Sequence, residues 1–164
     1  MNNFITNSDE NSLSNRIKTL IRKSDELKFL VGFFYFSGIK ELYHGLKNKD
    51  NIILKVLVGL NVDTNLYTIY EFAQSNYNLN DKQKTYNFLE GVKKSLNTDV
   101  FDTEEFYEQI RFFVDLIKND RLIIRKSYKP NHSKLYIFKL SEDQVARNSL
   151  FITGSSNLTQ AGMT

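Results

Sequence analysis

Two short segments of the sequence carry residue types that could act on an anion. His132-Ser133-Lys134 places an imidazole two residues before an ammonium group. Gly154-Ser155-Ser156-Asn157 is a turn-prone segment that can offer backbone N–H groups, hydroxyls and an amide to an anion. An imidazole, an ammonium and an amide brought together predict a phosphate site. The imidazole in such a site can act as nucleophile or as proton donor.

The elements that must position these residues are indicated by changes in hydrophobic period. Apolar stretches over residues 27–36 and 52–60, each with a single lysine (Lys28 and Lys55), are typical of strands buried on both faces of a parallel sheet. Helical spacing over residues 39–47 lies between them, so the three segments predict a βαβ unit. Short strands are also expected at 121–127, 133–139 and 149–153. Because Pro130 separates the first two of these, we expect them to form a hairpin.

Helical spacing recurs in four further segments, at residues 13–21, 66–73, 88–96 and 106–117. Ser12 or Asn11 is the expected cap of the first helix, and Asp63, Asp81 and Asp102 stand where other caps are needed. The predicted fold class is α/β, a mixed sheet flanked by helices, in a single domain over residues 1–164. Alternation along the strand at 133–139 would place His132 and Lys134 on one face.

Composition and charge bear on the cellular location of the chain and on its binding partners. The chain has no cysteine, so disulfides are excluded and a cytoplasmic location is expected. Its longest apolar run, residues 29–36, is far shorter than the roughly 20 residues of a membrane span, and we find no signal peptide. The net charge of +3 says little about partners. Residues 121–139, however, hold bases and no acid; Arg121, Arg125, Lys126 and Lys129 are either nucleic-acid-binding residues or a solvated strand edge.

His132-x-Lys134 followed by Gly154-Ser155-x-Asn157 resembles the motif of the phospholipase D superfamily. The extended segment 151–162 is similar to single-motif bacterial phospholipase D-like nucleases and to the phospholipase D-like domains at the N-termini of large helicases. The resemblance implies a phospholipase D-like fold in which His132 forms a phosphohistidine or acts as its general-acid counterpart. Lys134 and Asn157 would hold the phosphoryl oxygens, and Ser155 would support the loop.

The same resemblance implies a partner and no cofactor. Members of the family need two motifs in one site, and this chain has one, so a homodimer with His132 from each subunit at the two-fold axis is expected. The family chemistry requires no metal. The other histidine, His44, stands in the predicted helix at 39–47 without a partner motif, and we interpret it as structural or solvent-exposed.

Two features depart from the family pattern. Lys139 occupies the position where the family has an aspartate. The sequence also stops at Thr164, where an acidic residue that orients the histidine would be expected to follow. We therefore expect an N-terminal fragment of a longer protein, which could carry helicase domains downstream.

Three functions remain open at this point. The first is a metal-independent phosphodiesterase acting on nucleic acid, DNA in preference to RNA. The second is a catalytically weak nucleic-acid-binding or dimerisation module of a larger helicase or restriction-type protein. The third is a phospholipase or phosphatidyl transferase, which the lack of a membrane-seeking amphipathic segment disfavours.

Overall fold

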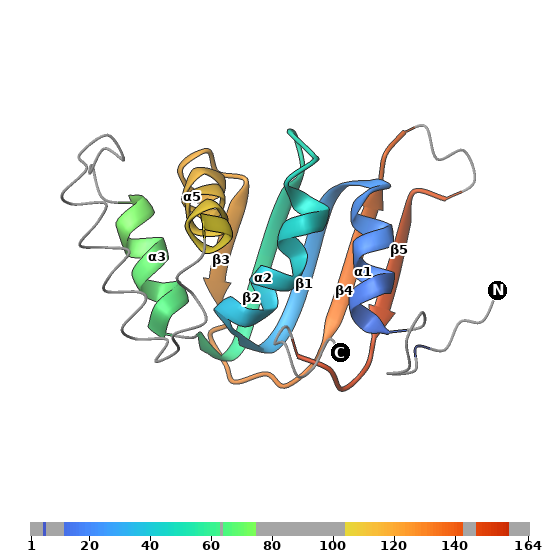
Figure 1. Ribbon diagram of the computed structural model, residues 1–164. Helices are drawn as coiled ribbons and strands as arrows, with labels where there is room; N and C mark the ends of the chain where they lie inside the picture. The colour runs from blue at the N-terminus through green and yellow to red at the C-terminus, as the bar shows by residue number, and fades with distance from the viewer. Residues whose placement is uncertain (1–4, 6–11, 63, 75–103, 143–146, 158–164) are drawn as a thin grey trace.

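The computed structural model describes residues 5, 12–62, 64–74, 104–142 and 147–157. Within these residues a five-stranded mixed sheet carries a layer of helices on one face (Figure 1). The elements in chain order are α1 (Leu13–Ile21), β1 (Ser24–Phe34), α2 (Phe36–Leu46), β2 (Ile53–Val62), α3 (Thr64–Gln74), α5 (Glu104–Lys118), β3 (Leu122–Lys126), β4 (Leu135–Leu140) and β5 (Ser149–Thr153). The predicted α/β class with a mixed sheet is confirmed.

The strand order is β3-β2-β1-β4-β5. β1, β2 and β3 are parallel, and the pairing of β1 with β2 across α2 confirms the predicted βαβ unit. The predicted burial of β1 and β2 on both faces is wrong, because the described helices cover one face and Lys28 and Lys55 are exposed on the other. β4 runs antiparallel to β1, and β5 runs antiparallel to β4. The predicted hairpin of the strands around Pro130 is wrong, because β3 lies at one edge of the sheet and β4 lies on the far side of β1. The long connection through α5 returns the chain parallel to β2, so β3 pairs there instead.

The structure also shifts some boundaries. α1 and β5 begin and end where the sequence predicts, and Ser12 caps α1 by accepting a hydrogen bond from the Asn15 N–H at 3.3 Å. β4 begins at Leu135, so His132 and Lys134 precede this strand rather than lying along one of its faces. The predicted helix at 88–96 and the caps Asp63, Asp81 and Asp102 lie outside the described residues.

The core fills the space between the sheet and the helix layer. Alternate residues of the central strands are buried there, and the ring of Phe29 on β1 meets Tyr136 and Phe138 on β4 edge to face, with centroids 5.0 and 5.6 Å apart. These rings anchor β4, the strand that follows the His132 segment, firmly against β1.

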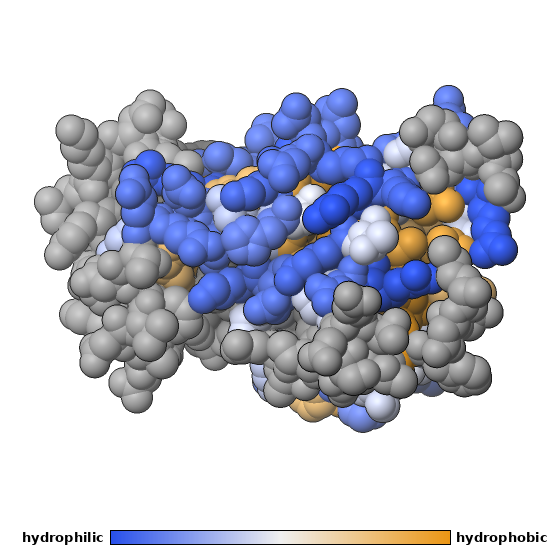
Figure 2. Space-filling model, turned by 45° about the vertical axis from the view of Figure 1, so that its right-hand side comes forward, coloured by the Kyte–Doolittle hydropathy of each residue, from blue (hydrophilic) through white to orange (hydrophobic). Residues whose placement is uncertain are grey.

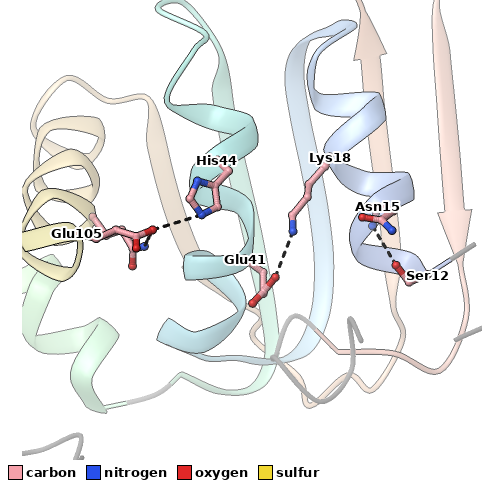
Figure 3. Close-up of polar contacts among 7 residues, drawn as sticks. Ser12, Asn15, Lys18, Glu41, His44 and Glu105 are labelled. Atoms are coloured by element: carbon pink, nitrogen blue, oxygen red, sulfur yellow. Dashed lines mark hydrogen bonds and ion pairs between the residues drawn. The ribbon is translucent and has the colours of Figure 1, made fainter. Parts of the chain in front are cut away.

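Ion pairs connect neighbouring helices on the outside of the layer (Figure 3). Lys18 of α1 pairs with Glu41 of α2 at 3.3 Å, and His44 of α2 pairs with Glu105 of α5 at 3.4 Å. The His44 side chain is 55% exposed, which confirms that it belongs to the surface and not to the core.

Among the described residues visible in Figure 2, hydrophilic side chains predominate, and the most extended apolar area lies toward the right of the view. None of the helices in the described part of the chain has the length and apolar character needed to cross a membrane.

Candidate active site

Four strand ends meet at one edge of the sheet, the lower edge in Figure 1. Because of the strand directions, the C-terminal ends of β1, β2 and β5 lie beside the N-terminal end of β4. The loop 127–134 joins β3 to β4 and must therefore pass the ends of β2 and β1 on its way. His132 lies in this loop, and Asn157 follows β5 at the same edge.

Backbone hydrogen bonds hold the loop 127–134 against the end of β2. The Ser127 N–H donates to the Val58 carbonyl at 2.9 Å, and the Asn131 N–H donates to the Gly59 carbonyl at 3.1 Å. The Asn131 side-chain oxygen in turn accepts from the Ser133 N–H at 2.7 Å. The backbone on both sides of His132 is thereby fixed although the loop has no regular secondary structure.

Two glycines, one on β2 and one on β1, allow the loop 127–134 to lie close to these strands. A Cβ atom on Gly59 would overlap the backbone carbonyl of Asn131, so only glycine fits there while the loop keeps its place. A Cβ atom on Gly32 of β1 would lie 3.1 Å from the His132 ring and 3.2 Å from the side-chain oxygen of Asn157. Gly32 and Gly59 therefore form the floor on which the site residues lie, and we call them the glycine floor.

We predict that Gly59→Ala moves the loop 127–134 away from β2. The new methyl group meets backbone atoms, which cannot rotate out of its way, so the free energy of unfolding should fall by about 1–3 kcal/mol. The ring signals of His132 in NMR spectra should shift at the same time. Gly45→Ala is the matched control, because the nearest atoms to a Cβ there belong to the side chain of Ile21 and not to the backbone. Unchanged His132 signals in Gly59→Ala would contradict the role assigned to the floor.

Lys134 is a buried charge at the centre of the site. Its side chain points inward, and the residue is only 4% exposed. The Nζ atom lies 2.8 and 2.9 Å from the two ring nitrogens of His132, and it donates to the carbonyl of the same residue at 2.7 Å. An ammonium only donates, so a ring nitrogen that accepts from it must be unprotonated. Among the described residues, no carboxylate lies within ion-pair distance of this ammonium.

The amide of Asn157 is oriented by the end of β1. Its side-chain oxygen accepts a hydrogen bond from the Phe33 N–H at 3.2 Å. Because a backbone N–H can only donate, its partner must be the oxygen, and the amide NH₂ group is left to donate elsewhere. The ring of Phe33 also meets the His132 ring edge to face, with centroids 6.1 Å apart.

Two hydroxyl groups join β5 and the segment after it to β4 and the residue that precedes it. The Tyr136 hydroxyl donates to the Ser156 carbonyl at 2.8 Å, and the Thr153 hydroxyl donates to the Lys134 carbonyl at 3.1 Å. Tyr136 is 1% exposed, and burial raises the pKa of its hydroxyl, which keeps it in the form that donates. The two parts of the predicted site are thus joined directly.

The remaining predicted site residues are not all at this edge. Ser155 is exposed beside Asn157, and Lys126 and Lys129 are exposed at the end of β3 and in the loop 127–134. Arg121 lies at the opposite end of β3, where its guanidinium donates to the carbonyls of Ile52 and Lys49 at 3.2 and 2.6 Å. Arg125 lies on the sheet face away from the helices. The structure therefore brings Lys126 and Lys129 to the edge that holds His132, but it does not bring Arg121 there.

Gly32, Gly59 and Tyr136 take part in the site, and sequence reasoning did not assign them to it. The two glycines carried a usable signal, since each lies inside a mainly apolar strand. A glycine at such a position often marks a place where another part of the backbone comes close to the strand. Tyr136 carried none, because its alternating position is equally typical of a core residue.

Comparison of the sequence with protein-family models gives no match, and comparison with curated proteins gives no significant match. The resemblance to the phospholipase D superfamily therefore rests on the sequence motifs of His132, Lys134 and Asn157 alone.

Proposed function

We propose that this chain is a metal-independent phosphodiesterase of the phospholipase D type, which cleaves nucleic acid through a phosphohistidine intermediate. DNA is the expected substrate in preference to RNA. The proposal concerns the edge of the sheet that carries His132, Lys134 and Asn157.

The observation that carries this proposal is the buried ammonium of Lys134. Burying a charge without an opposite charge is expensive, and proteins keep such a group where a ligand supplies the opposite charge. An anion beside His132 would accept hydrogen bonds from Lys134 and from the amide NH₂ group of Asn157, whose oxygen is held by the Phe33 N–H. Phosphate is the anion best matched to these donors, because it offers several oxygens around one centre.

The chemistry then follows in two displacements. A ring nitrogen of an unprotonated His132 attacks the phosphorus, a P–N bond forms, and the P–O bond to the leaving strand breaks. The leaving oxygen takes a proton from a second imidazole. Water next attacks the phosphorus, gives its proton back to that imidazole, and the P–N bond breaks. Lys134 and Asn157 stabilise the charge that builds up on the phosphoryl oxygens in both steps.

The second imidazole is expected from a second copy of the chain. His132 is the histidine of the site in each chain, while His44 lies on α2 in the helix layer. A two-fold interface at the lower edge of the sheet would place one His132 from each subunit on the same phosphate. The homodimer is therefore part of the proposal.

The direct test is cleavage of DNA by the purified chain in the presence of EDTA. We expect plasmid and single-stranded DNA to be cut at a rate that excess chelator does not change, because the proposed nucleophile and acid are both imidazoles. Single-stranded RNA and a phosphatidylcholine vesicle are compared in parallel. Hydrolysis of the vesicle without cleavage of nucleic acid would contradict the proposal and support a phospholipase.

A nucleic-acid-binding or dimerisation module is the second candidate, and one observation favours it. Lys139, at the position where the family has an aspartate, is exposed on β4 and supplies no carboxylate to the site. Binding of DNA in a gel-shift assay without any cleavage would support this reading over the nuclease.

A further inference from the structure

The sheet face opposite the helices carries apolar side chains across neighbouring strands. One row runs across the sheet through Ile123, Lys55, Lys28, Ile137 and Phe151, and the next row runs through Arg125, Leu57, Leu30, Leu135 and Thr153. A groove of about 530 Å³ lies over the middle of these rows. Leu57 and Phe151 are 42% and 70% exposed, so large apolar groups remain in contact with solvent.

Charges stand in the middle of this face and not only at its border. Lys28 and Lys55 lie directly opposite each other on the two central strands, with side chains 53% and 46% exposed. Glu26 is shared between them, at 3.5 Å from Lys28 and 2.5 Å from Lys55. Arg125 lies in the next row, and Lys139 of β4 lies opposite Glu26, so among the described residues of this face four cations accompany one carboxylate and positive charge is in excess.

We propose that this open face is a docking surface for an acidic amphipathic helix of a partner protein. The apolar side of such a helix would cover Leu30, Leu57 and Ile137. Its carboxylates would meet Lys28, Lys55 and Arg125, which the single carboxylate of Glu26 does not balance. A helix that lies across the strands along the row of Leu57, Leu30 and Leu135 would bury its apolar stripe there. The charges at one side of that stripe would then lie over Lys55 and Lys28 in the neighbouring row.

The charge pattern disfavours a second copy of the chain as the occupant. Two of these faces packed together would bring the cations of both copies into one interface with two carboxylates, and like charges so placed repel. Nucleic acid fits poorly because the groove floor is largely aliphatic, whereas single-stranded bases stack on aromatic rings. This inference does not depend on the activity proposed for the His132 edge.

The test uses two synthetic helical peptides of 18 residues and the full chain. Both peptides carry leucine at helical spacing; one has glutamate beside the leucines and the other has lysine at the same positions. We expect the glutamate peptide to bind more tightly by about tenfold or more, since the change from glutamate to lysine replaces attraction by repulsion at several cations of the face at once. Lys28→Glu should remove most of the preference for the glutamate peptide, because the remaining cations of the face are then nearly balanced by two carboxylates. Leu57→Ser, which removes apolar surface without adding a charge, should weaken binding of the glutamate peptide. Arg111→Glu, the same charge change on α5 behind the sheet, should leave binding unchanged.

Several outcomes would overturn the inference. Equal affinity for the two peptides, or no binding of either, would show that the charges do not select a partner. A dimer that Leu57→Ser converts to a monomer would make the second copy the occupant. Loss of DNA binding in Lys28→Glu, with no binding of the glutamate peptide, would assign the face to nucleic acid. Thermal unfolding of each variant shows whether it is folded, and cleavage by the His132 edge is measured separately.

Discussion

The His132→Ala protein should lose DNA cleavage by at least about 10³-fold, because the residue is the proposed nucleophile and its copy on the partner subunit the proposed acid. Folding should be almost unaffected, since His132 is exposed in the loop 127–134 and its backbone is held by hydrogen bonds that the substitution keeps. DNA affinity should also remain close to that of the wild type. The measurements are single-turnover cleavage, DNA affinity and thermal unfolding.

The chain offers its own matched control for this substitution. His44→Ala removes an imidazole that is 55% exposed and paired with Glu105 on the helix layer, so cleavage should continue at the wild-type rate. Cleavage by His132→Ala at the wild-type rate would rule out the mechanism. Loss of cleavage in both variants would point to a change in folding.

A site shared between two subunits also predicts the activity of mixtures of wild-type and His132→Ala chains. When equal amounts of wild-type and His132→Ala chains are refolded together, random pairing leaves about a quarter of the dimers with both histidines. Activity should then fall to about a quarter of that of the same total amount of wild-type protein. Activity of one half would show that each chain works alone.

Local patterns in the sequence were sufficient for the parallel core of the fold. The apolar runs at 27–36 and 52–60 located β1 and β2. The expectation that both faces of these strands are buried was wrong, because a run with one lysine does not distinguish a strand covered on both sides from one whose second face carries apolar side chains in contact with solvent. The place of β3 was not predictable in this way. Its pairing with β2 depends on the path of the chain through α5. The prediction of a hairpin used only the short spacing between the two strands around Pro130, which contains no information on that path.

The wrong prediction of a hairpin between β3 and β4 also explains why Gly32 and Gly59 were not assigned to the site from the sequence. In a hairpin, residues 127–134 would form a compact turn between neighbouring strands. In the observed order, they pass the ends of β2 and β1, and this passage requires the glycine floor at Gly59 and Gly32. The motif residues His132, Lys134 and Asn157 could be found from their spacing, but the surface that supports them depends on the sheet order.

Lys134→Met should separate catalysis from stability. Methionine has a similar length and no charge, so the cost of burying an ammonium disappears together with its hydrogen bonds to His132. These effects oppose each other, and we expect the free energy of unfolding to stay within about 1 kcal/mol of the wild type. Cleavage should fall by about 10²–10³-fold, because the ammonium acts on the charge that develops on the phosphoryl oxygens.

Lys139→Met is the control for this prediction, since it makes the same change five residues along, at an exposed position on β4. Its cleavage rate should remain near the wild-type value. DNA affinity, measured alongside the cleavage rate, distinguishes two roles for Lys134. A larger loss of rate than of affinity is expected of a group that acts mainly in the transition state, whereas equal losses would make Lys134 a ground-state binding residue. A strongly destabilised Lys134→Met protein would instead mean that the ammonium is there to hold the loop 127–134, and the argument from a buried charge to an anion site would fail.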